Sequence, residues 1–142
     1  MDPAYVDGAV QIVQQHSSRE RPIYIISKYD NLVPFLAERF SAMPFSEVAT
    51  SLLTPKEVAL CIGVILEQKP EIIFVDTELV ENPSDSGIDP AHPMYLLASQ
   101  HFELRPKLAM LRELTRVYLG VRDQYEVIKK GPLLSVCRRI QR

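Results

Sequence analysis

The sequence predicts one α/β domain over residues 1–142, a three-layer α/β/α sandwich of the Rossmann-like or flavodoxin-like kind with about five strands. Two compact apolar runs, Ile23–Ser27 and Ile72–Asp76, are typical of strands that helices cover on both faces. Helical patterns alternate with these strands, and that order favours parallel pairing through right-handed crossovers. A hairpin pattern follows late in the sequence. We therefore expect a mostly parallel sheet with a C-terminal antiparallel hairpin.

Capping signals mark the helices of the first half. Asp2 and Pro3 predict a helix that begins at Pro3, because Asp caps helices and Pro fits their first position. The run Thr54–Glu57 predicts a second helix start, in which the Thr and Glu side chains cap each other's backbone amides. Another helix is expected after Asp30. Its inner side is expected to carry Leu32, Phe35, Leu36 and Phe40.

The remaining elements are read from breaks in the apolar pattern. Phe45–Ala49 is expected to form a weak middle strand, and Thr77–His92 a long polar loop. Pro93 and Pro106 each look like a first helical residue, and Gly120 suits the end of the second of these helices. The hairpin is expected to pair Tyr125–Lys129 with Leu133–Ile140.

Composition excludes several classes of protein. The chain has 16 basic and 18 acidic residues and a net charge of −2, which excludes a generally cationic nucleic-acid binder. Its two cysteines exclude a disulfide scaffold, and we expect Cys61 and Cys137 to be buried free thiols. No apolar run approaches the ~20 residues that span a bilayer. No signal peptide is recognised after Met1, so a stand-alone chain is expected to be cytoplasmic.

Polar side chains after the strands predict a ligand site, because open parallel sheets bind ligands at the carboxyl ends of their strands. Three of the residues with acidic side chains, Asp30, Asp76 and Glu78, could hold a divalent cation there. The alternative is that Asp76 only caps the next turn or pairs with Lys28. The ligand-binding candidates are Ser27, Lys28, Asp30, Ser51, Thr54, Asp76, Thr77 and Glu78.

Signatures of specific catalysis are missing from the sequence. No glycine follows the first strand, and no GxGxxG or P-loop spacing occurs, which disfavours nucleotide cofactors. The three histidines lack the i, i+4 spacing of a helical metal site, and no serine has GxSxG context. A receiver domain would carry two adjacent acids after its first strand, where this chain has Ser27 and Lys28. We therefore expect no catalytic residue and no resident metal, and no cofactor can be assigned.

The end of the chain is basic. Five cations and no acids occupy its last 14 residues, and on one side of the hairpin they could face an anionic lipid surface or a parent membrane region. The alternative is a solvated edge strand whose charges deter aggregation. A homodimer is a further partner that the sequence leaves open. The five cations are Lys129, Lys130, Arg138, Arg139 and Arg142.

Several segments together resemble a known family. They are the strand and turn PIYIISKYD at 22–30, the run KPEIIFVD at 69–76, and the end YEVI at 125–128 with GPLLSVCRR at 131–139. This pattern, spread over most of the chain, resembles the soluble C-terminal domains that follow the membrane helices of polytopic GT-C-type glycosyltransferase-like proteins. The resemblance implies an accessory domain, usually outside the cytoplasm. Such a domain would bind or position a sugar or lipid-linked molecule, or hold an assembly together.

Three functions follow as hypotheses. The first is a non-catalytic accessory domain, for recognition or assembly, of a membrane-associated and glycosyltransferase-like protein. Its catalytic carboxylates would lie in the membrane region of the parent, so no catalytic residue is carried over. The second is a small stand-alone enzyme with a carboxylate or metal site at the strand ends. The third is a degenerate receiver-like interaction module.

Overall fold

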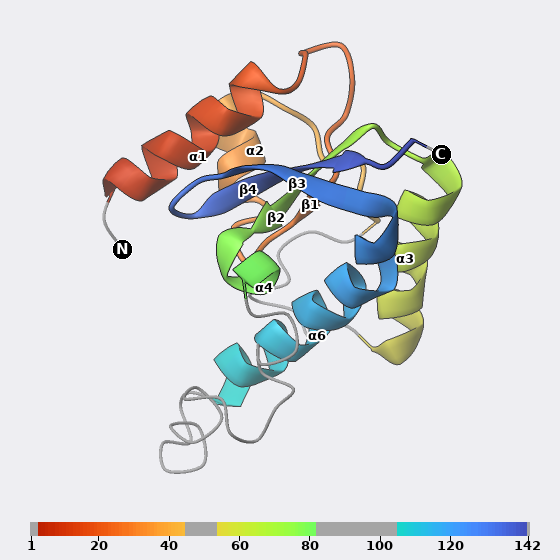
Figure 1. Cartoon of the computed structure of the whole chain (residues 1–142). Helices are drawn as coiled ribbons and strands as arrows, with labels where there is room; N and C mark the ends of the chain where they lie inside the picture. The colour runs from red at the N-terminus through yellow and green to blue at the C-terminus, as the bar shows by residue number, and fades with distance from the viewer. Residues whose placement is uncertain (1–2, 45–53, 82–104, 142) are drawn as a thin grey trace.

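The structure is a computed structural model that describes residues 3–44, 54–81 and 105–141. Its centre is a four-stranded mixed sheet with the strand order β1-β2-β4-β3 (Figure 1). The α/β class is therefore confirmed. The strands are β1 (Ile25–Ile26), β2 (Ile72–Asp76), β3 (Tyr125–Lys130) and β4 (Leu134–Arg139).

The two apolar runs pair as expected. β1 and β2 are parallel, with Ile25 opposite Phe74 and Ile26 opposite Val75. β1 is shorter than the run that predicted it, since regular pairing is confined to Ile25 and Ile26. An isolated parallel bridge joins Ile23 to Ser41 beyond it.

The expected mostly parallel sheet is not found among the described strands. β4 lies antiparallel to β2, with Phe74 opposite Val136, and β3 lies antiparallel to β4. The physical reason is that the hairpin of β3 and β4, confirmed here, inserts its second strand directly beside β2. The antiparallel strand β4 thus occupies the edge of β2 where the sequence led us to expect a parallel strand, connected by a further crossover helix.

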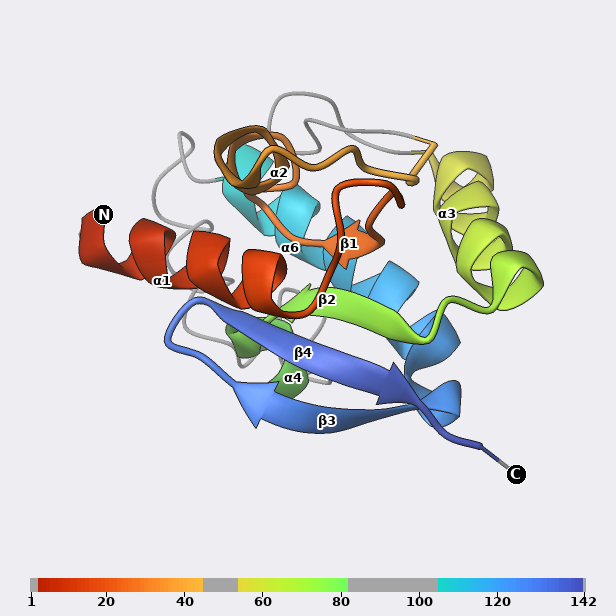
Figure 2. The same cartoon turned by 90° about the horizontal axis from the view of Figure 1, so that it is seen from above.

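Helices cover both faces of the sheet (Figure 2). α1 (Pro3–Gln15) and α2 (Leu32–Ala37) cover one face, and α3 (Pro55–Gln68) and α6 (Arg105–Val121) cover the other. None of the helices within the described residues has the length and apolar character needed to cross a bilayer.

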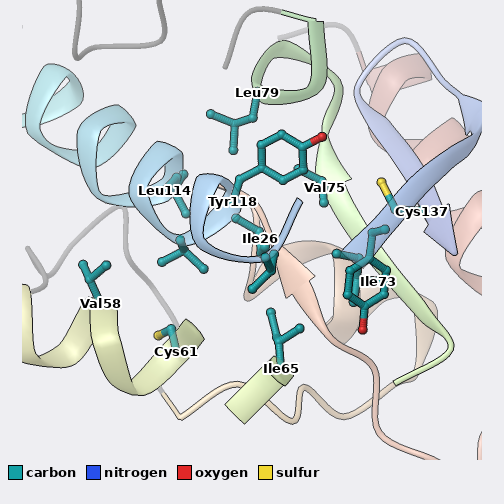
Figure 3. Packing of buried hydrophobic residues seen from close by; sticks show 13 residues of the cluster. Ile26, Val58, Cys61, Ile65, Ile73, Val75, Leu79, Leu114, Tyr118 and Cys137 are labelled. Carbon is teal, nitrogen blue, oxygen red and sulfur yellow. The ribbon is translucent and has the colours of Figure 1, made fainter. Parts of the chain in front are cut away.

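The larger core lies on the α3 and α6 side of the sheet (Figure 3). Ile73 and Val75 of β2 contribute to it together with Ile65 of α3 and Tyr118 of α6. Cys137 of β4 belongs to the same cluster and Cys61 of α3 does also; both are buried free thiols, as predicted. Burial raises the pKa of each thiol to about 11, so both are protonated and unreactive at neutral pH.

The smaller core lies under α1. Phe74 and Val136, paired across β2 and β4, pack there with Val13 of α1 and Val33 of α2. Successive residues of β2 thus enter opposite cores, which explains why the whole run had to be apolar.

Local helix signals are largely confirmed. α1 begins at Pro3. At the start of α3, the Glu57 amide donates to Thr54 Oγ1 at 3.2 Å and the Thr54 amide donates to Glu57 Oε1 at 3.0 Å. This is the predicted reciprocal cap, and it satisfies two amides that lie outside the helical hydrogen-bond pattern.

Three expectations about helices are wrong. The predicted loop begins with a short helix, α4 (Thr77–Glu81), because Leu79 is buried against the larger core. Gly120 lies inside α6, which runs on to Val121. The face of α2 is also reversed, because Val33, Pro34 and Ala37 are the residues that pack inward. The side chains expected inside are exposed, and they are Leu32, Phe35, Leu36 and Phe40.

Some predicted features lie outside the described residues. These are the weak middle strand at 45–49, Ser51, the rest of the polar loop at 82–92, the helix start at Pro93 and the last cation, Arg142.

Candidate functional site

The carboxyl ends of β1 and β2 bring several predicted ligand residues together. We call Ser27, Lys28, Asp76, Thr77 and Glu78 the carboxyl-end cluster. The Lys28 backbone amide donates to Asp76 Oδ2 at 3.0 Å. This bond joins the turn after β1 to the last residue of β2. Asp76 thus caps the turn after β1, and not the turn that follows Asp76 in the sequence, which was the alternative considered above.

Asp76 is the unusual member of this cluster. Its side chain is only 2% exposed, and its second oxygen, Oδ1, is buried without a hydrogen-bond partner. Burial raises its pKa from 3.8 to about 6, while Ser27, the Lys28 amide and the Lys28 charge act in the opposite direction. A carboxyl group with a pKa near neutrality is a feature that catalytic acids and bases share with strained structural groups.

Lys28 and Glu78 form the outer part of the cluster. Lys28 Nζ lies 3.4 Å from Glu78 Oε2, and both side chains are partly exposed. Burial lowers the pKa of Lys28, but the charges of Glu78 and Asp76 raise it, and the net result is a pKa above 10.5. The ammonium group therefore stays charged and is engaged with carboxylates of its own chain.

Ser27 and Thr77 are also used within the chain. Ser27 Oγ accepts from the Tyr29 amide at 2.9 Å, a bond that shapes the turn after β1. Thr77 Oγ1 donates to the Gly131 carbonyl at 2.7 Å and lies 2.8 Å from Ser135 Oγ. The Thr77 hydroxyl thus holds α4 to the β3–β4 hairpin, so both side chains have structural roles.

The remaining predicted candidates do not join the cluster. Asp30 is buried, and its charge contributes to raising the pKa of Cys61 on α3. Thr54 caps α3. Among the described residues, no three His, Cys, Asp or Glu side chains are placed to hold a metal ion, so Asp30, Asp76 and Glu78 do not form the cation pocket considered from sequence.

The basic residues of the hairpin lie at its two ends. Lys129 and Lys130 pair with Val136 and Ser135 near the turn, whereas Arg138 pairs with Glu126 at the far end. Arg138 also lies 3.4 Å from the Glu126 carboxylate, and Arg139 donates to the Lys69 carbonyl at 3.3 Å. The two arginines therefore have contacts within the chain.

A pocket opens at the opposite end of the same two strands. It has a volume of about 320 Å³ and lies between the end of α1 and the starts of β1 and β2. Ile23 and Phe74 are buried at its base, and Ile72 is half-buried beside them. We call this hollow the amino-end pocket. Pro22 and Pro70 also line this pocket, and each lies two or three residues before the start of a strand, β1 and β2 respectively.

Polar groups line the mouth of the amino-end pocket. Arg21, Glu71 and Ser18 line it and are exposed. Within the described part of the chain, no ion pair or hydrogen bond involves the side chain of Arg21 or of Glu71. His16 Nδ1 lies 2.9 Å from the Ile12 carbonyl, so the ring donates there and leaves Nε2 for another partner.

Sequence reasoning missed this pocket. The rule for parallel sheets directs attention to the carboxyl ends of strands, and the pocket lies at their amino ends. Pro22 and Pro70 were the available signal, because each lacks an amide proton and stands just before a buried strand. Neither proline, however, indicates that the end of α1 would leave the amino-end pocket beneath it.

Comparisons of the chain with protein-family models, with curated proteins and with solved structures find no match.

Proposed function

We propose that this chain is a non-catalytic recognition domain of a membrane-associated, glycosyltransferase-like protein, and that it binds a sugar unit in the amino-end pocket. The observation that carries the proposal is the contrast between the two ends of β1 and β2. Most polar groups of the carboxyl-end cluster have hydrogen-bond or ion-pair partners within the chain, the exception being Asp76 Oδ1. The amino-end pocket instead combines an apolar base with two charged side chains, Arg21 and Glu71, that have no side-chain partner in the described part of the chain.

The chemistry of the pocket fits a neutral, polyhydroxylated ring. Arg21 supplies hydrogen-bond donors, whereas Glu71 and the free nitrogen of His16 supply acceptors. The opposite charges of Arg21 and Glu71 balance, so neither an anion nor a cation is favoured. Ile72 and Phe74 offer apolar surface to the carbon face of a ring. Such a volume lies at the small end of ligand sites, which suits one sugar unit.

The setting within a longer protein is part of the same proposal. The resemblance to C-terminal domains of glycosyltransferase-like proteins supports a location beside membrane helices, outside the cytoplasm. The parallel bridge between Ile23 and Ser41 supports a fifth strand at that edge, as the Rossmann-like or flavodoxin-like layering requires. The cations of the hairpin would then lie toward an anionic lipid surface or the parent membrane region.

Amide chemical-shift titration of the isotope-labelled chain tests the proposal. Neutral sugars such as methyl glucoside and N-acetylglucosamine are expected to shift amides of residues 16–24 and 70–74. A sugar phosphate is expected to bind no more tightly, because Glu71 opposes its charge. Absence of shifts in this region with every neutral sugar would exclude the pocket as a sugar site. Turnover of a sugar nucleotide by the chain would exclude a non-catalytic role.

Matched variants separate the pocket from the surface. Glu71→Gln keeps the shape of the side chain and removes its charge, and we expect it to weaken sugar binding several-fold. Glu20→Gln is the control, since Glu20 is exposed nearby and does not line the pocket. Equal weakening by both variants would contradict a specific role for Glu71.

A second candidate function is supported by one observation, the buried Asp76 with its raised pKa and unpartnered oxygen. It is a carboxylate-based enzyme acting at the carboxyl ends of the strands. Asp76→Asn would abolish such an activity and leave sugar binding at the amino-end pocket unchanged.

A further inference from the structure

Strand β3 is the outermost strand of the described sheet, and Figure 2 shows no helix or strand of the described residues beside its outer edge. Five of its six residues, Glu126 to Lys130, are exposed. Val127 and Ile128, at the centre of the strand, are 36% and 40% exposed. An edge with unpaired backbone groups and an apolar centre is a template for another strand.

The charges along β3 are arranged with opposite signs at its two ends. Glu126 lies near the start and Lys129 near the end. Pairing with β4 shows their faces: Glu126 is opposite Arg138, and Lys129 is opposite Val136. Val136 packs under α1, and Arg138, two residues later in β4, lies on the same face. Glu126 and Lys129 therefore share the face of the sheet that α1 covers.

The irregularity in β3 is what brings these two residues to one face. The register shifts between Val127 and Lys129, so Ile128 is an extra residue in the strand. In a regular strand Glu126 and Lys129, three residues apart, would point to opposite faces. Lys130, opposite Ser135, points to the other face.

We propose that β3 pairs antiparallel with β3 of a second copy of this chain, so that Glu126 of each copy lies opposite Lys129 of the other. A two-fold axis perpendicular to the sheet reverses the strand and keeps its faces, which is the geometry of a closed, self-complementary dimer. Val127 and Ile128 of both copies then lie at the axis. Lys129 would repel a strand that lacks a matching acid, and the reversed copy supplies one.

Sedimentation of the full chain over a range of concentrations tests this inference. The chain is expected to pass from monomer to dimer as its concentration rises. Glu126→Lys and Lys129→Glu each place like charges opposite one another, and each is expected to weaken the dimer by roughly tenfold or more. The exchanged double variant, Glu126→Lys with Lys129→Glu, is expected to restore it. An equimolar mixture of the two single variants is expected to form a heterodimer.

Lys130→Glu is the matched control. This variant makes the same charge change as Lys129→Glu, one residue away. Because Lys130 points to the face of the sheet opposite to that of Glu126, Lys130→Glu is expected to weaken the dimer less than Lys129→Glu does. A chain that stays monomeric throughout would overturn the proposal. So would a dimer that tolerates both single reversals, a double variant that fails to recover, or a control as damaging as Lys129→Glu. Circular dichroism of each variant checks that the fold is retained.

Discussion

The Lys28 amide donates a 3.0 Å hydrogen bond to Asp76 Oδ2, and this bond helps to fasten the turn after β1 to the end of β2. The contact joins residues far apart in sequence at the only parallel strand pair among the described strands. The bond is available whether or not the carboxyl group is ionised, because Oδ2 can accept in both states. The position of Asp76 thus has a structural explanation that does not need its charge.

The charge of Asp76 is expected to cost stability at neutral pH. The folded state raises its pKa to about 6, above the usual 3.8, so folding favours the protonated form. The contribution of the Asp76 carboxyl group to the free energy of unfolding is therefore largest below about pH 4. It is lost as the pH rises through about 6. Asp76→Asn is expected to raise the free energy of unfolding at pH 7, by about 3 kcal/mol, and to match the wild type near pH 4. Urea unfolding at several pH values measures the difference.

If Asp76→Asn were less stable than the wild type at pH 7, or matched it only above pH 7, the predicted direction of the stability change would be wrong. Glu81→Gln is a suitable control, because Glu81 is exposed at the end of α4 and lies outside the carboxyl-end cluster.

Gly131 is expected to tolerate no side chain. A Cβ there would lie 2.6 Å from the Leu134 carbonyl oxygen and 2.5 Å from Ile12 Cδ1, and the carbonyl belongs to the hairpin backbone. Gly131→Ala is expected to destabilise the protein by about 1–3 kcal/mol through this crowding. Gly8→Ala in α1 meets nothing within 4 Å and is expected to stabilise by about 0.5–1 kcal/mol through helix propensity. Thermal melts of both variants measure these changes. If both variants raised the melting temperature, or both lowered it, the explanation by crowding at Gly131 and helix propensity at Gly8 would be wrong.

The hydroxyl of Thr77 is expected to couple to that of Ser135. Thr77→Val keeps the side-chain shape but leaves the Gly131 carbonyl and Ser135 Oγ, both buried, without this partner. The expected loss is about 1–3 kcal/mol in the free energy of unfolding. In a double-mutant cycle with Ser135→Ala the two losses should not add, and a coupling energy of about 0.5 kcal/mol or more is expected. Simple additivity would show that the 2.8 Å contact contributes nothing.

The reciprocal cap at Thr54 is expected to stabilise α3. Thr54→Ala removes the acceptor of the Glu57 amide and should cost about 1 kcal/mol. Thr54→Ser retains the hydroxyl and is expected to recover most of that loss. Lys56→Ala, in the first turn of the same helix and exposed, is expected to change stability by less than about 0.5 kcal/mol. Chemical unfolding of the three variants tests the order.

The sequence was most informative where local chemistry decides structure. The Thr54–Glu57 cap, the helix start at Pro3 and the apolar runs of β1 and β2 all depend on interactions within a few residues or on burial on both faces. These predictions are confirmed. The hairpin is confirmed as well, because its turn residues and strand pattern lie close together in the chain.

Expectations failed where packing between distant segments decides. Periodicity alone could not tell which side of the short helix α2 faces α1, and the side with Phe35 and Leu36 is exposed. Nor could it show that β4 would lie beside β2. The carboxyl-end cluster was assembled by the parallel pairing as expected, but its side chains bind other groups of the same chain. The amino-end pocket depends on where α1 stops above the sheet, which no local pattern specifies.

The place of β4 in the sheet has a consequence for synthesis. β4 separates β2 from β3, so the edge of β2 from Ile72 to Asp76 has no partner strand until residues 134–138 have been translated. While the ribosome is still adding the intervening segment, the nascent chain exposes an apolar strand with open hydrogen-bonding groups. Chaperone capture is therefore expected to peak in that interval and to fall once β4 emerges.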